Sequence, residues 1–117
     1  MTYRVIDVSE VEPVANGRIR PMRRALEIES FGINELTLPA DSTSYPEHDE
    51  LKTGQDELFL VLEGTGTMTV DGDSFELRPG RYVYVTPESR RYIEPGSNGL
   101  RIVAVGVPAG GAHGGRI

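Results

Sequence analysis

Two closely spaced turn signals divide residues 67–85, which read TMTVDGDSFELRPGRYVYV. Asp71-Gly72 lies between two short β-prone runs, and Asp-Gly in that setting is a strong signal for a β-hairpin. Pro79-Gly80 then precedes alternating tyrosine and valine residues, which suit a pleated surface. This stretch therefore predicts a series of short strands joined by tight turns.

Turn signals continue at short intervals on both sides of this stretch. Gly64-Thr65-Gly66 ends one strand, Phe31-Gly32 joins two others, and residues 95–99, PGSNG, separate a further two. The strands expected outside residues 67–85 are 24–29, 33–38, 57–63, 90–94 and 100–107. Eight or more short strands with almost no helical periodicity predict an all-β domain, either a sandwich or a barrel. One helical turn is expected within residues 9–14.

The composition excludes several kinds of site. The 117 residues predict one domain, and the lack of cysteine excludes disulfides, thiolate zinc sites and cysteine nucleophiles. Only His48 and His113 are present, so one chain cannot supply a three-histidine metal centre. A net charge of −6 argues against nucleic-acid binding. No apolar run approaches the roughly 18 residues of a membrane span, so we expect no membrane association and a cytoplasmic protein.

The chain is expected to have three parts. Residues 1–22 form an N-terminal arm and first-strand region, 23–107 the barrel, and 108–117 a flexible, glycine-rich tail. A basic cluster surrounds Pro21 where the arm meets the barrel. We interpret it as a solvated strand face or as partners for the acidic stretch 41–57, and a patch that binds an anion or a nucleic acid is the alternative. The cluster consists of Arg18, Arg20, Arg23 and Arg24.

Two spaced motifs lie within residues 45–107. The first contains His48-Asp49-Glu50, Glu57 and Gly64, and the second contains Gly72, Pro79-Gly80 and Arg91. These motifs resemble those of a cupin. His48-Asp49-Glu50 stands at the family's H-x-H position, Glu57 at its glutamate, Gly64 at its closing glycine and Arg91 at its last histidine. The resemblance implies a single antiparallel jelly-roll β-barrel with little helix. It also implies a homodimer, and exposed strand edges near residues 23–38 are the expected seam.

Cupins with a working metal centre present three histidines and one glutamate to the ion. The matching positions of this chain hold His48, Glu50, Glu57 and Arg91. A carboxylate can still bind a hard metal ion, but a guanidinium has no free lone pair and stays cationic. We therefore expect either no cofactor or a divalent Mn, Fe, Ni or Zn ion held by the histidine and the two glutamates.

Three interpretations of these four positions remain open. The first is a metal-free pocket in which Arg91 contacts an anionic ligand, which makes the protein a divergent small-molecule-binding cupin without the usual three-histidine centre. The second is a metal-dependent oxygenase or isomerase that uses His48, Glu50 and Glu57. The third is a structural or interaction barrel whose polar interior is closed by ion pairs, such as Arg91 with Glu57 or Glu50.

Three more residues are candidates for the same ligand pocket. Tyr82 and Tyr84 alternate with valines, so their side chains share one face of a strand, either lining the pocket or lying outside the barrel. Gln55 lies at the entry to the strand that carries Glu57 and could reach the mouth of the barrel. Phe59 and Val61 share the parity of Glu57 and are expected to pack in the core.

Overall fold

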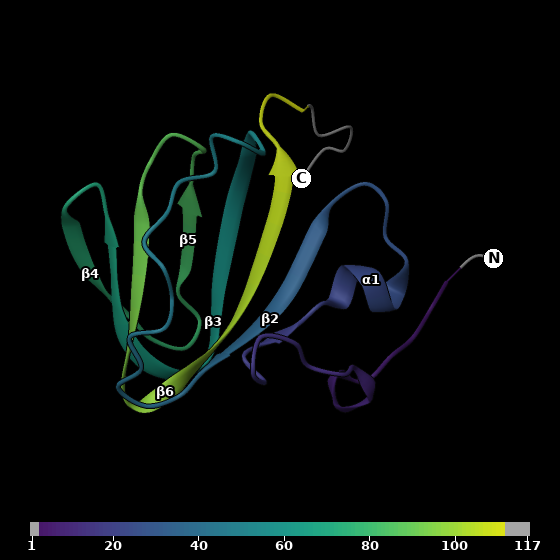
Figure 1. The fold of residues 1–117 in the computed structure, drawn as a ribbon, viewed down its shortest axis with the longest axis horizontal. Helices are drawn as coiled ribbons and strands as arrows, with labels where there is room; N and C mark the ends of the chain where they lie inside the picture. The colour runs from purple at the N-terminus through teal and green to yellow at the C-terminus, as the bar shows by residue number, and fades with distance from the viewer. Residues whose placement is uncertain (1–2, 112–117) are drawn as a thin grey trace.

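The computed structural model describes residues 3–111 and consists mainly of antiparallel strands (Figure 1). A 3₁₀ turn, η1, spans Val8–Glu10, and a short helix, α1, spans Met22–Leu26. The strands are β1 (Ile19–Arg20), β2 (Gly32–Leu38), β3 (Gln55–Val70), β4 (Asp73–Leu77), β5 (Tyr82–Val85) and β6 (Arg91–Pro108). His113 and most of the tail predicted to be flexible lie outside the described residues.

The long strands β3 and β6 form the framework of the sheet. They pair along most of their length, from Gln55 opposite Pro108 to Val70 opposite Arg91. β2 flanks β6 on its other side, β1 extends the sheet beyond β2, and β4 and β5 pair with different halves of β3. The sheet curls around a core but does not close on itself (Figure 1). The predicted antiparallel barrel with little helix is confirmed in this open form.

A glycine at position 64 permits the bend that carries β3 from one half of the barrel to the other. The register between β3 and β6 shifts between Val61 and Glu63, and again between Gly64 and Gly66. Gly64 has a φ of +81°, and a Cβ atom there would lie 2.0 Å from the carbonyl oxygen of Gly99. The closing glycine of the first motif therefore has a steric role, because the two backbones approach too closely for a side chain.

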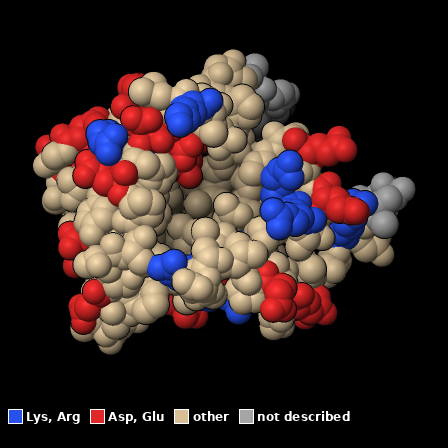
Figure 2. All heavy atoms as spheres, in the orientation of Figure 1, with Lys and Arg blue, Asp and Glu red and all other residues tan. Residues whose placement is uncertain are grey.

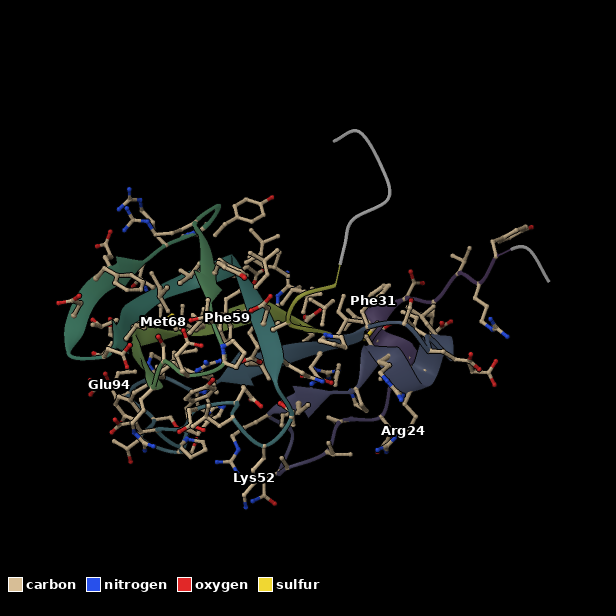
Figure 3. The ribbon with its side chains drawn as sticks, turned by 90° about the horizontal axis from the view of Figure 1, so that it is seen from above. Arg24, Phe31, Lys52, Phe59, Met68 and Glu94 are labelled. Atoms are coloured by element: carbon tan, nitrogen blue, oxygen red, sulfur yellow. The ribbon has the colours of Figure 1, made fainter. Side chains whose placement is uncertain are left out.

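The core fills the concave side of the sheet. Phe59 and Val61 are both 1% exposed, which confirms their predicted inward direction. Figure 3 shows Phe59 and Met68 inside the barrel, whereas Lys52 and Glu94 lie at its periphery. In the part of β3 before the register shifts, the residues that share the parity of Phe59 thus line the interior, and the same parity carries Glu57 to that face.

Three of the expected strand boundaries are wrong. Gly64-Thr65-Gly66 does not end a strand, because β3 continues through it from Gln55 to Val70, with register shifts against β6. Residues 24–29 do not form a strand, because Arg24 and Ala25 belong to α1, where arginine, alanine and leucine favour a helix and Glu27 ends it at a φ of +56°. Residues 95–99 do not interrupt the sheet either. Pro95 pairs with Gly66 inside one continuous β6, so the PGSNG sequence marks a bend within a strand. The helical turn expected within residues 9–14 begins earlier, as η1.

Candidate functional site

The backbone of the segment before β3 is tied to the first residue of β6 and to the segment before it. His48 donates its N–H to the carbonyl of Arg91 at 3.1 Å, and Arg91 donates to the carbonyl of His48 at 2.9 Å. Two residues further, Glu50 donates its N–H to the carbonyl of Pro87 at 2.9 Å. These bonds hold residues 48–50 against one side of the barrel. The side chains of His48 and Glu50 then lie close to that of Glu57.

His48, Glu50 and Glu57 come together as predicted for a metal site. One ligand atom from each residue lies within 4.8 Å of those of the other two. His48 Nε2 is 3.1 Å from Glu50 Oε1, which also shows that Glu50 faces the histidine. We refer to these three residues as the HEE group.

Both ring nitrogens of His48 face oxygen acceptors. Nδ1 lies 2.9 Å from the carbonyl oxygen of Pro46, and Nε2 lies 3.1 Å from the carboxylate of Glu50. A neutral imidazole carries a single N–H, so it can donate to only one of these two acceptors. A bound cation would suit both contacts, because Nδ1 would donate to Pro46 while Nε2 and Glu50 face the cation.

Arg91 is fully buried and is held from several sides. Its Nη1 donates to Oε1 of Glu57. Nη2 donates to the carbonyls of Thr86 and Ser89 at 2.8 and 2.9 Å, and Nε donates to the carbonyl of Ser89 at 3.3 Å. All three guanidinium nitrogens therefore face protein acceptors. This geometry favours the predicted ion pair with Glu57 over contact between Arg91 and an anionic ligand.

The environment of Glu57 makes its negative charge costly. Burial raises the pKa of its carboxyl group, and the nearby carboxylate of Glu50 raises it further, while Arg91 and His48 oppose the shift. The side chain is only 15% exposed. A carboxylate in such a place is stabilised by any additional positive charge, whether a proton or a metal cation.

Tyr45 is a site residue that the sequence reasoning did not identify as a candidate. It packs against the core, and its ring centroid lies 5.5 Å from that of His48. Burial, followed by the charge of Glu57, raises the pKa of its phenol, so the hydroxyl stays protonated and can donate a hydrogen bond. The signal available in the sequence was an aromatic residue three positions before His48, in a segment otherwise rich in serine, proline and glutamate.

A pocket opens beside His48. Its volume is about 260 Å³, and a hollow is visible near the middle of the face shown in Figure 2. Most of its walls are apolar and come from β1, β2 and the segment before β3. The lining residues are Ala15, Arg18, Ile19, Leu36, Leu38, Ser44, Tyr45, Pro46 and His48.

The other candidates for the ligand pocket are placed differently. Tyr82 and Tyr84 are 65% and 62% exposed and do not line this pocket, because the alternating residues Val83 and Val85 pack against or within the core. Gln55 lies two residues before Glu57 on β3, so the two side chains share a face. Its Oε1 lies over Gly106, at only 2.6 Å from the position that a Cβ atom on Gly106 would take. Gln55 therefore lies near the HEE group, whereas the two tyrosines belong to the outer surface.

The fold and the site together define a small jelly-roll barrel with an inward-facing His-Glu-Glu cluster. Residues 35–106 match the family model described as the cupin domain, and the chain belongs to the cupin family. Among the described residues, no helix has the length and apolar character needed to cross a bilayer.

Comparison with known proteins shows the same architecture. An uncharacterized protein of Methanocaldococcus jannaschii is 35% identical over 54 residues, which span 45% of this chain and less than half, 43%, of that protein. A cupin protein from Bacteroides fragilis superposes with a TM-score of 0.83 at 21% identity, covering 99% of this chain and 92% of the other. A predicted oxalate decarboxylase from Thermotoga maritima gives 0.73 at 20% identity, covering 90% and 99%. A sugar phosphate isomerase from Silicibacter pomeroyi gives 0.71 at 18% identity, covering 91% and 76%.

Proposed function

We propose that this cupin binds a hard divalent cation, Mn²⁺ or Fe²⁺, through the HEE group, and a small organic molecule in the adjoining pocket. The observation that carries the proposal is the convergence of His48, Glu50 and Glu57, with one ligand atom from each within 4.8 Å of those of the other two. One imidazole nitrogen and two carboxylates form a donor set that suits Mn²⁺ or Fe²⁺ better than copper.

The distances within the HEE group are compatible with one ion. Ligand atoms about 2.1 Å from a metal lie at most about 4.2 Å from each other. Adjacent ligands of one ion lie about 3.0 Å apart. The atoms of the group lie within 4.8 Å, so binding requires a contraction of up to about 1.8 Å. The 3.1 Å separation between His48 and Glu50 already suits two adjacent ligands of one ion.

Each residue of the HEE group is oriented by a second residue. The carbonyl of Pro46 holds His48 Nδ1 at 2.9 Å, and Thr53 Oγ1 donates to Glu50 Oε2 at 2.8 Å. Arg91 donates to Oε1 of Glu57. Partners of this kind fix the direction of metal ligands, and they are expected around a metal site. Arg91 also leaves the second oxygen of Glu57 for the ion.

The charge of the site favours a cation. Ionised Glu50 and Glu57 together carry −2, Arg91 contributes +1, and a neutral His48 adds nothing, so the site holds an uncompensated negative charge. A bound divalent ion would act as a Lewis acid and polarise an oxygen atom of the ligand. Three protein ligands leave positions on such an ion for that oxygen, as the predicted oxygenase or isomerase activity would require.

Metal analysis tests this proposal. Protein dialysed against a chelator and then against excess Mn²⁺ should retain about one equivalent by elemental mass spectrometry, and Glu50→Gln should retain almost none. Glu47→Gln is the matched control, because the Glu47 side chain is 58% exposed and pairs with Arg90 outside the HEE group. Wild-type protein that takes up no metal, or a Glu50 variant that keeps it, would refute the cation site.

A further inference from the structure

Arg18 differs from the rest of the basic cluster because it lines the pocket beside His48. Its Nε donates to the carbonyl of Ala15 at 2.9 Å, and its own carbonyl accepts the N–H of Thr37 at 2.8 Å. The side chain is thus anchored at its base to the pocket wall. Across residues 3–111 no carboxylate forms an ion pair with it, although five other arginines are paired. The terminal nitrogens of Arg18 remain as donors for a ligand.

The walls between Arg18 and His48 are apolar. Ile19 of β1, Leu36 and Leu38 of β2, and Pro46 supply them. Such walls stabilise a hydrocarbon body by removing it from water, but they offer few partners for hydroxyl groups. A volume of about 260 Å³ is below the range typical for drug-sized ligands, so the occupant is a small molecule.

Charges of opposite sign lie at and near the pocket. Arg18, which lines it, is a permanent cation, whereas His48, which also lines it, belongs to the HEE group with the carboxylates of Glu50 and Glu57. A ligand with one negative group is therefore attracted to Arg18 and repelled from the HEE group when no cation is bound there. The guanidinium fork also suits the two oxygens of a carboxylate.

We propose that the pocket takes a small monocarboxylate with an apolar body, whose carboxylate binds Arg18 and whose hydrocarbon chain lies along Ile19, Leu36 and Leu38. The inference rests on the proposed small-molecule binding and names the ligand class. It does not favour a sugar phosphate, since one arginine and largely apolar walls match neither a dianionic phosphate nor a row of hydroxyl groups.

Calorimetric titration of the whole, chelator-treated protein with hexanoate tests the inference, and hexanamide serves as the uncharged probe of similar shape. Hexanoate should bind at least tenfold more tightly than hexanamide. Glucose 6-phosphate should bind more weakly than hexanoate. Equal binding of hexanoate and hexanamide, or tighter binding of glucose 6-phosphate, would overturn the assignment.

Variants locate the carboxylate. Arg18→Gln should weaken hexanoate binding at least tenfold and leave hexanamide binding unchanged. Arg23→Gln should change neither affinity, because Arg23 belongs to the same basic cluster but not to the pocket lining. Ala15→Asp places a negative charge beside Arg18 at an exposed position with a φ of +54°, which aspartate tolerates, and should also weaken hexanoate binding. An unchanged hexanoate affinity in the Arg18 and Ala15 variants would refute the proposed orientation.

A parallel Mn²⁺ titration separates this inference from the cation site. The inference is supported if hexanoate binds without metal and this binding depends on Arg18. That support holds even if the protein binds no Mn²⁺ and the proposed cation site is wrong. Hexanoate binding that requires Mn²⁺ and ignores Arg18 would place the carboxylate on the metal. That result would refute the inference while supporting the cation site.

Discussion

Arg91 donates through Nη1 to Oε1 of Glu57, joining the first residue of β6 to the inner face of β3. Arg91 occupies the position at which the cupin motif has its last histidine, so a permanent cation stands where the family has a neutral metal ligand. The carbonyls of Thr86 and Ser89 bind the same guanidinium. The arginine therefore supports the barrel and orients Glu57 at the same time.

Replacing Arg91 by methionine should lower the free energy of unfolding by about 3 kcal/mol, because it leaves a largely buried carboxylate and two carbonyls without their donor. Arg90→Met is the matched control. The Arg90 side chain is 54% exposed and pairs with Glu47 at 3.2 Å, so its loss should cost less than about 1 kcal/mol. Urea denaturation measures both. Equal losses would show that the buried pair contributes no more than the exposed one.

Arg91→His should increase the affinity for Mn²⁺ at least tenfold, which corresponds to about 1.4 kcal/mol. The substitution removes a positive charge close to the ion and offers an imidazole nitrogen as a fourth ligand. Arg91→Met separates the two effects, since it removes the charge without adding a ligand. If titration gives both variants the same affinity, the histidine does not reach the ion.

The raised pKa of Glu57 predicts how the stability of the metal-free protein depends on pH. The folded state holds the Glu57 proton more tightly than the unfolded state, because burial disfavours the carboxylate. This contribution is fully present below the ordinary glutamate pKa and is lost as pH rises through the higher folded value. The stability of wild-type protein relative to Glu57→Gln should therefore fall between the ordinary pKa and that raised value. Urea denaturation at a series of pH values measures the difference, and a relative stability that rises over this interval would contradict the prediction.

Gly64→Ala should destabilise the fold by more than about 3 kcal/mol, because it combines a left-handed backbone with a clash against the carbonyl of Gly99. Gly72→Ala is the control that separates the two causes. Gly72 has a similar φ of +87°, but nothing lies within 4 Å of its added Cβ, so a loss of about 1 kcal/mol is expected. Similar losses in the two variants would mean that strain in the left-handed backbone, and not the contact with Gly99, dominates.

The sequence predicted the elements that rest on local patterns. The Asp71-Gly72 turn joins β3 to β4 as expected, and the parity of Glu57, Phe59 and Val61 correctly directed three side chains inward. Alternation also showed that Tyr82 and Tyr84 share a face. It could not show which face, because a strand with two apolar sides carries no signal that separates inside from outside.

Features that depend on distant pairing could not be predicted in the same way. The ion pair of Arg91 was left open between two glutamates 34 and 41 residues away in sequence. Glu57 is selected by the fold, in which β5 pairs with β3 at Glu57 and the segment after β5 holds Arg91. The pocket likewise combines Arg18, Leu36 and His48 from three separate segments. No local spacing connects these residues, so neither Arg18 nor Tyr45 was predicted to belong to the pocket.

The central position of β6 determines the order in which the chain can fold as it is synthesised. β2 makes its longest pairing with β6, so residues 32–38 must wait for partners at 100–106 before most of their backbone hydrogen bonds can form. Until then, an apolar strand edge stays open to association with other chains. Pairings so distant in sequence also slow folding, because the loop must close before the contacts stabilise it. The last strand of the barrel therefore completes both the sheet and, through Arg91, the site.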